Sequence, residues 1–143
     1  MIARARVLLA AALLVAGATA CSDLTGNVNA QGQFDLVLVN GTQVPYSYVD
    51  NNGNQILVES DTYVLNSDGS YTDQQISRVN NIDQSGIEFG SWSQSGNTVF
   101  FRPTQSDFDT TPYQATVRND GNYGGSRTLT ISLNGSTAIY SDL

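Results

Sequence analysis

The residues that could carry chemistry in this chain are few. The sequence contains no histidine and no lysine, so it lacks the commonest general base and the amine nucleophile of Schiff-base enzymes. Asp107 and Asp109 alternate in a polar stretch, but calcium takes about six to eight oxygen ligands and the stretch lacks the Asp-x-Asp-x-Asp-Gly pattern. We therefore predict that the protein is not an enzyme and uses no metal ion and no cofactor.

Aromatic side chains with polar tips are better candidates, because they serve binding pockets as well as strand interiors. The chain has seven tyrosines and one tryptophan. Arg102 and Arg118 could bind a carboxylate ligand, although we expect them to pair with surface acids. The predicted ligand-binding residues are Tyr46, Tyr48, Trp92, Phe101 and Tyr113.

The elements that position these rings show the period of two that is typical of β-strands with one buried face. Apolar side chains alternate in this way at residues 34–39, 113–118 and 129–133. Asn40-Gly41 and Asn134-Gly135 predict tight hairpin turns, since both residue types tolerate positive φ. Further strands are expected at residues 43–49, at 56–65 with a bend near Ser60, at 70–79 and at 137–141.

Residues 86–103 are expected to form a hairpin that turns at Ser95-Gly96-Asn97 and holds the densest aromatic cluster of the chain. Within it, Trp92 shares the face of Ile87 and Phe89 only if the strand bulges at Gly90-Ser91. The stretch before it, residues 80–85, is expected to be loop, as are residues 105–111 and the glycine-rich residues 119–126.

About eight or nine short strands with turn signals between them predict an all-β fold. Nearly every connection is tight, which favours an antiparallel up-and-down barrel of about eight strands. A β-sandwich is the alternative, and it would need the longer connections as crossovers. The barrel domain is assigned to residues 33–143.

Residues 1–20 have the three parts of a secretory signal peptide: a basic start, an apolar middle and a small-residue end. Ala18-Thr19-Ala20-Cys21 resembles the lipobox of bacterial lipoproteins, with Cys21 as the lipidated residue; ordinary signal cleavage would instead leave Cys21 as a free thiol. We predict lipidation, because an odd cysteine is otherwise a liability in a secreted protein. Residues 21–32 are predicted to be a flexible tether.

The chain is acidic, with a net charge of −7 at pH 7. This balance argues against nucleic acid and anionic lipid as partners, since both reward basic patches. We therefore expect membrane attachment only through the lipid on Cys21. In lipoproteins of double-membrane bacteria, the absence of an aspartate after that cysteine, as at Ser22, favours the outer membrane or the periplasmic face of the envelope.

Most of residues 32–143 resembles small bacterial lipocalin-like envelope lipoproteins. The resemblance depends on three stretches, Val39-Asn40-Gly41 with Val44-Pro45, Tyr63-x-Leu65-Asn66-x-Asp68-Gly69-x-Tyr71, and Gly90-Ser91-Trp92-x-x-x-Gly96-Asn97-x-Val99. It implies an eight-stranded barrel or half-open barrel whose interior holds one small apolar ligand, with no catalytic residues.

Two functions are compatible with these observations. In the first, a lipid-anchored lipocalin-like barrel at the cell envelope binds a small apolar or amphipathic molecule without catalysis. In the second, the barrel is solid, and its outer surface contacts another envelope protein as a structural or interaction module.

Overall fold

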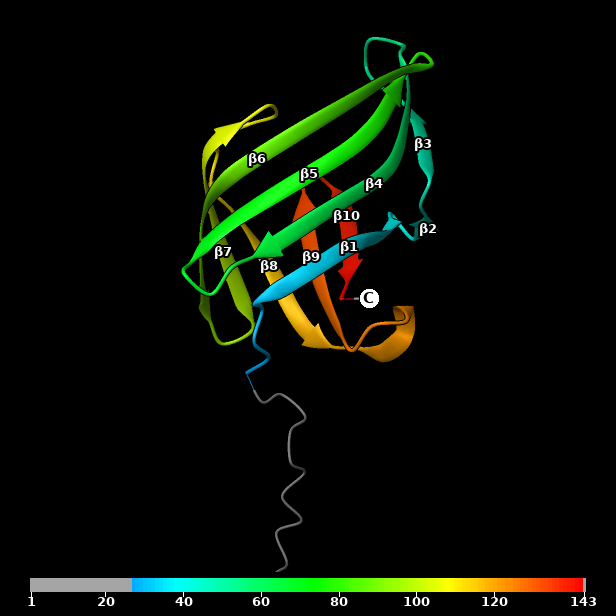
Figure 1. Cartoon of the computed structure of the whole chain (residues 1–143). Coiled ribbons are helices and arrows are strands. Elements are labelled where there is room, and N and C mark those ends of the chain that lie inside the picture. The colour runs from blue at the N-terminus through cyan, green and yellow to red at the C-terminus, as the bar shows by residue number, and fades with distance from the viewer. Residues whose placement is uncertain (1–26, 143) are drawn as a thin grey trace, which may run out of the picture.

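The computed structural model describes residues 27–142, and this part of the chain is built almost entirely of β-strands (Figure 1). The strands are β1 (Gly32–Val39), β2 (Thr42–Gln43), β3 (Tyr46–Val49), β4 (Gln55–Leu65), β5 (Ser70–Val79), β6 (Ile82–Ser95), β7 (Thr98–Ser106), β8 (Tyr113–Asn119), β9 (Arg127–Leu133) and β10 (Ser136–Ser141), and a single 3-10 turn, η1 (Gly121–Tyr123), precedes β9. No helix within these residues is long and apolar enough to cross a bilayer.

Eight of the strands, β1 and β4 to β10, form a closed antiparallel barrel (Figure 1). Each strand from β4 to β10 pairs with the next one in the chain, and β1 closes the barrel by pairing with both β10 and β4. The predicted all-β, up-and-down barrel is therefore confirmed, and the sandwich alternative is not formed. The signal peptide of residues 1–20 and the lipidation site Cys21 lie outside the described residues.

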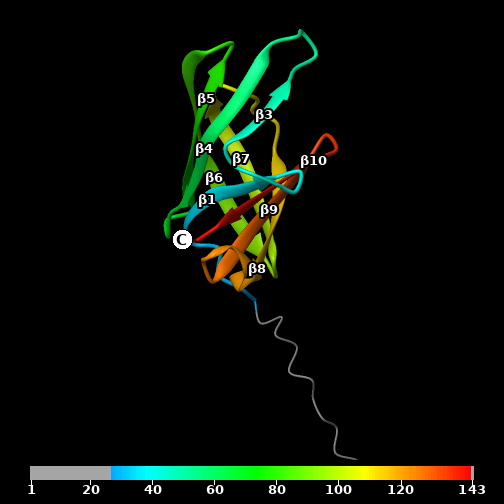
Figure 2. The same ribbon diagram turned by 90° about the vertical axis from the view of Figure 1, so that its right-hand side faces the viewer.

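The strand predicted at residues 43–49 is divided in two. β2 pairs with β1 across the Asn40-Gly41 turn, whereas β3 pairs with β4. Pro45 lies between the two pieces, and proline has no N–H to donate to a ladder. This break lets the chain leave one side of the barrel and extend the other, as Figure 2 shows for β3 beside β4.

The predicted loop at residues 80–85 is wrong, because β6 already begins at Ile82. The turn is made by Asn80 and Asn81 alone, with φ angles of 48° and 66°. Asparagine tolerates this left-handed region better than most residues do, so two asparagines can replace the usual Asn-Gly pair. The predicted bend near Ser60 is confirmed, since the β4–β5 register shifts between Val58 and Ser60.

The inner face of β6 is the one that carries Glu88 and Trp92, not the one that carries Ile87 and Phe89. Glu88 is buried, whereas Phe89 is 37% exposed. The β6–β7 register does shift at Phe89/Gly90, near the expected bulge, but the extra residue lies in β7. Trp92 therefore has the same parity as Glu88, and the aromatic cluster of this hairpin is divided between the two faces of the sheet.

One end of the barrel is filled and plugged. Five side chains that are at most 1% exposed pack there, namely Phe34, Leu65, Val99, Val117 and Leu129. Val28 and Ala30 are also buried, and their backbone N–H groups donate to Asn97 Oδ1 (3.1 Å) and Gln94 Oε1 (2.9 Å). We call this part the closed half of the barrel.

The tether predicted over residues 21–32 is consequently wrong for its second half. Residues 28–31 belong to the folded domain, because Val28 and Ala30 bury apolar side chains and Arg127 Nη1 donates to the backbone carbonyls of Asn29 and Gln31. Arg127 also pairs with Asp142 (2.6 Å) and stands over the ring of Phe34. Residues 21–26 of the predicted tether lie outside the described residues.

Candidate functional site: a half-hollow acidic barrel

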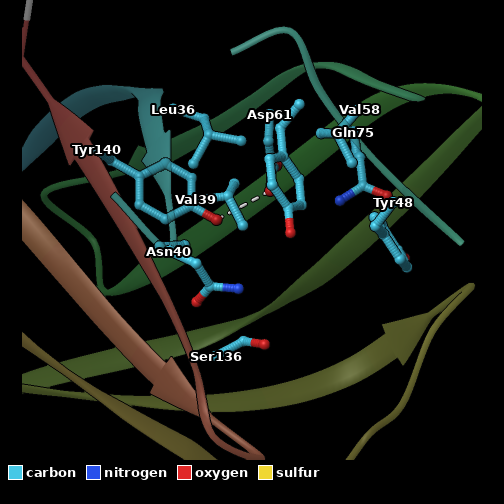
Figure 3. A pocket seen from close by; sticks show the side chains of 11 residues that line it. Leu36, Val39, Asn40, Tyr48, Val58, Asp61, Gln75, Ser136 and Tyr140 are labelled. Carbon is cyan, nitrogen blue, oxygen red and sulfur yellow. Dashed lines mark hydrogen bonds between the residues drawn. The ribbon is translucent and has the colours of Figure 1, made fainter. Parts of the chain in front are cut away.

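The other half of the barrel is hollow. Two neighbouring cavities of about 310 and 330 Å³ share Asp61 and Gln75 in their walls. The first is lined by Leu36 and Val39 of β1, Tyr46 and Tyr48 of β3, Val58 of β4, and Ala138 and Tyr140 of β10, with Asn40 and Ser136 at its rim (Figure 3). The second is lined by Tyr63, Asp73, Glu88 and Tyr113, together with Phe108 and Asp109 of the β7–β8 loop. We call this part the open half.

A layer of five aromatic rings separates the two halves: Tyr63, Tyr71, Phe101, Tyr113 and Tyr140. Their ring centroids lie 4.9–6.2 Å apart in stacked, tilted and edge-on pairs, which is the usual range for aromatic contacts. Phe101 is fully buried, and the hydroxyls of all four tyrosines make hydrogen bonds to polar groups of the open half or to one another. The layer is thus an apolar floor with a polar upper surface.

Three carboxyl groups lie above this floor on three adjacent strands. Asp61 belongs to β4, Asp73 to β5 and Glu88 to β6, and Asp73 is directly opposite Glu88 in the β5–β6 register. Asp73 is also opposite Tyr63, so Asp61 is its diagonal neighbour two residues along β4. The three residues are only 6%, 5% and 4% exposed.

Glu88 is fully satisfied by hydroxyl donors. Tyr71 and Tyr113 both donate to Glu88 Oε1, and Ser106 donates to Oε2 (3.0 Å). Because the Tyr113 hydroxyl gives its hydrogen to Glu88, the hydroxyl of Tyr63, 2.8 Å away, must donate to Tyr113. Hydrogen bonds from three hydroxyls are the compensation that a buried carboxylate requires.

Asp61 and Asp73 are not satisfied in the same way. Tyr140 donates to Asp61 Oδ2 (2.9 Å; Figure 3), but Asp61 Oδ1 and Asp73 Oδ1 have no hydrogen-bond partner within residues 27–142. Burial, and then the interaction with Asp61, raises the pKa of Asp73 to about 10. Burial also raises the pKa of Asp61. Two buried carboxyl groups on adjacent strands that interact with each other retain at least one proton near neutral pH.

The tyrosines of the floor remain protonated and act as donors. Burial raises the pKa of Tyr63, Tyr71, Tyr113 and Tyr140 above the ordinary value, and the neighbouring carboxyls raise it further. These hydroxyls therefore provide fixed hydrogen-bond donors at any physiological pH.

Three of the predicted ligand-binding residues do line the open half. Tyr46 and Tyr48 form one wall of the first cavity and stack with ring centroids 5.8 Å apart, and Tyr113 lines the second cavity. Phe101 lies beneath, in the floor. Trp92 lines neither cavity: its indole Nε1 donates to the carbonyl of Asn66 (3.0 Å), at the turn between β4 and β5 on the closed side.

The acids singled out in the sequence have local roles. Asp107 accepts from the backbone N–H of Ile87 (3.0 Å), and Asp109 accepts from the N–H and hydroxyl of Thr111 (3.0 Å each). Within residues 27–142, no group of three or more His, Cys, Asp or Glu side chains is arranged to hold a metal ion. The expected pairing of Arg102 and Arg118 with acids is not seen in this range, where the ion pairs are formed by Arg78 and Arg127.

The sequence analysis did not identify the three interior acids, although the alternation of inward and outward residues places Asp61 and Asp73 on the inward face. Asp61 has the same parity in its strand as Tyr63 and Leu65, and Asp73 has the same parity as Tyr71. A charged residue at a core-facing position of a strand is an informative exception. Glu88 was hidden because Ile87 and Phe89, on either side, suggested that the other face was buried.

No protein-family model matches the chain, and no curated protein matches it. What the arrangement can do therefore follows from its geometry. A hollow of several hundred cubic ångströms, with aromatic walls and a few converging polar groups, is suited to hold a small molecule.

Proposed function

We propose that the protein is a lipid-anchored component of the cell envelope that binds a small amphipathic molecule, without catalysis, in the open half of its barrel. The observation that carries the proposal is the contrast inside one barrel: side chains fill one half and leave cavities of about 310 and 330 Å³ in the other. Such volumes lie at the lower end of the range for small-molecule sites, about 300–1,000 Å³.

The composition of the walls supports an amphipathic ligand in particular. Leu36, Val39, Val58 and Ala138 provide an apolar side, and Tyr46 and Tyr48 provide aromatic faces. Most of the carboxyl groups lie at the second cavity: Asp73, Glu88 and Asp109 line it alone, and Asp61 lines both cavities. A molecule with one apolar and one polar end would match this division.

The alternative is a solid barrel that serves as an interaction module, and only the filled closed half supports it. The open half does not have the filled interior that this alternative requires.

The membrane attachment and the envelope location in the proposal are both inferred from the sequence around Cys21.

Native mass spectrometry of the protein extracted from envelopes of cells that express the full chain tests both parts. We expect a mass that includes acyl groups, lost in Cys21→Ala, and a population that carries one small bound molecule. Ala138→Phe should fill the first cavity and remove that population, whereas Ile139→Phe, on the next residue of β10, should not. If retention of small molecules is equal in both variants, the cavity is not the binding site.

A further inference from the structure

We propose that the molecule held in the open half is an organic cation: an amine whose ammonium group lies against Asp61 and Asp73 while its apolar body lies among the aromatic and aliphatic walls. This inference rests on the proposed binding function and names the chemical class of the ligand. It follows from four observations on charge, hydrogen bonding, wall composition and geometry.

The first observation is that the charge of the open half is one-sided. The second cavity is lined by four carboxyl groups, those of Asp61, Asp73, Glu88 and Asp109, and no arginine lines either cavity. A buried charge without a counter-charge is among the most costly features of a folded protein. A cationic ligand would supply the missing charge.

The second observation is the difference between Glu88 and the aspartate pair. Three hydroxyls donate to Glu88, whereas Asp61 Oδ1 and Asp73 Oδ1 receive no hydrogen bond from any other residue within residues 27–142, and a bond between the two aspartates needs the proton that the pair retains. Both side chains are more than nine-tenths buried and belong to the cavity wall. An ammonium group carries three N–H donors and no acceptor, which is the complement of two unpartnered carboxyl oxygens.

The third observation is the aromatic wall beside the pair. Tyr46 and Tyr48 stack near the mouth of the first cavity, and Phe108 and Tyr113 line the second. Aromatic faces attract organic cations through the negative face of the ring, and the attraction is stronger where water is excluded. The same rings and the aliphatic residues Val39, Val58 and Ala138 would cover an apolar body.

The fourth observation separates an organic cation from a metal ion. A calcium ion takes about six to eight oxygen ligands, and no cluster of three or more His, Cys, Asp or Glu side chains in residues 27–142 is arranged to hold one. Both Glu88 oxygens already accept hydrogen bonds from protein hydroxyls. The Asp61 and Asp73 carboxyl groups belong to the cavity wall and receive one hydroxyl donor, that of Tyr140, so they are better suited to an ammonium group.

Binding of an ammonium group should expel the proton that the pair retains. The titratable groups that face the pair are Tyr63 of β4, Tyr71 of β5, Glu88 of β6, Asp109 of the β7–β8 loop, Tyr113 of β8 and Tyr140 of β10. The tyrosines stay protonated, because burial raises their pKa. The proton therefore leaves from the Asp61–Asp73 pair, and affinity for an amine should rise with pH.

Three probes with the same apolar body and different head groups test the inference: 4-phenylbutylamine, 4-phenylbutanol and 4-phenylbutanoate. They are titrated calorimetrically into protein purified from cells that express the full chain, at pH 5, 6, 7 and 8. We expect the amine to bind at least tenfold more tightly than the alcohol at pH 7, and the carboxylate to bind most weakly. The dissociation constant of the amine should fall by up to tenfold per pH unit as the pH rises, with proton release seen in buffers of different ionisation enthalpy.

Asp73→Asn and Asp61→Asn should each abolish the preference for the amine and leave alcohol binding within about threefold of wild type. Asp83→Asn, which removes an exposed acid on the outside of β6, is the matched control and should leave the preference intact. If one variant fails to fold, the comparison of the three probes on the wild-type protein still tests the inference.

The other outcomes are distinct. If the amine and the alcohol bind equally, the aspartates merely share a proton; the inference is then overturned and the proposed function survives. If calcium chloride displaces the amine at a lower concentration than the amine itself requires, the pair is a metal site and the inference is overturned. If none of the probes binds, the proposed binding function itself is contradicted.

Discussion

The two halves of this barrel share strands β1, β4, β8 and β9 and differ in the side chains that face the interior. In the closed half the inward residues are Phe34, Leu65, Val99, Val117 and Leu129, all at most 1% exposed. In the open half, these shared strands together with β3, β5, β6 and β10 present carboxyl groups and small or aromatic side chains around two cavities. The comparison teaches that one half supplies stability and thereby permits the other half to remain hollow and electrostatically unfavourable.

The largest expected difference between the halves concerns packing. Val117→Ala, which removes two methyl groups from a fully buried side chain of the closed half, should lower the free energy of unfolding by about 2–3 kcal/mol. Val58→Ala, in the wall of the open half, should lower it by only about 1 kcal/mol, because the side chain already lacks neighbours on its cavity side. Urea denaturation followed by circular dichroism measures both. Equal losses would show that the open half is as tightly packed as the closed one.

An intermediate effect concerns the acids. Because burial raises the pKa of Asp73 to about 10, the folded chain keeps a proton that the unfolded chain releases above about pH 4. The contribution of Asp73 to stability is therefore largest below about pH 4 and falls as the pH rises toward 10, by at most about 1.4 kcal/mol per pH unit for one proton.

Asp73→Asn removes this titration and should flatten the pH dependence, raising stability at pH 8 by about 2 kcal/mol and changing it little at pH 4. Denaturation curves at pH 4, 6 and 8 for the wild type and the variant measure the effect. A difference in stability between the variant and the wild type that is the same at pH 4 and at pH 8 would contradict a retained proton in the open half.

The smallest effect on stability is expected at the mouth. Tyr48 is 44% exposed and contacts its strand neighbour Tyr46, so Tyr48→Ala should change the free energy of unfolding by less than about 1 kcal/mol. If Tyr48 covers the ligand, the same variant should nevertheless weaken 4-phenylbutylamine binding by about fivefold in calorimetric titrations. A large loss of stability would assign Tyr48 to the core instead of the mouth.

The fold could be predicted from the sequence where local signals agreed. Alternation at residues 34–39 and the turns at Asn40-Gly41 and Asn134-Gly135 predicted the correct strands, because each signal acts within a few residues. The turn at Asn80-Asn81 was missed because it lacks glycine. The inner face of β6 was missed because Ile87 and Phe89 are more apolar than Glu88, which enters the barrel only with the help of Tyr71, Tyr113 and Ser106.

The candidate site was less predictable than the fold. Tyr46, Tyr48 and Tyr113 were anticipated by residue type alone. The convergence of Asp61, Asp73 and Glu88 depends on the register of three strands, and that register is set by turns and by the β4 bulge, so it is not visible in any one segment.

The plug at residues 28–31 also decides which way the mouth points. The described chain enters the barrel beside Asn97 and Gln94, at the end where β6 turns into β7. Because the strands are antiparallel, the β9–β10 turn and the end of β1 lie at the opposite end of the barrel (Figure 1). A protein attached to a surface through residues upstream of this plug would hold its opening outward, toward the surrounding water. Its ligand would then enter from and leave to the surrounding solution. It would not pass directly between the cavity and the surface to which the protein is attached.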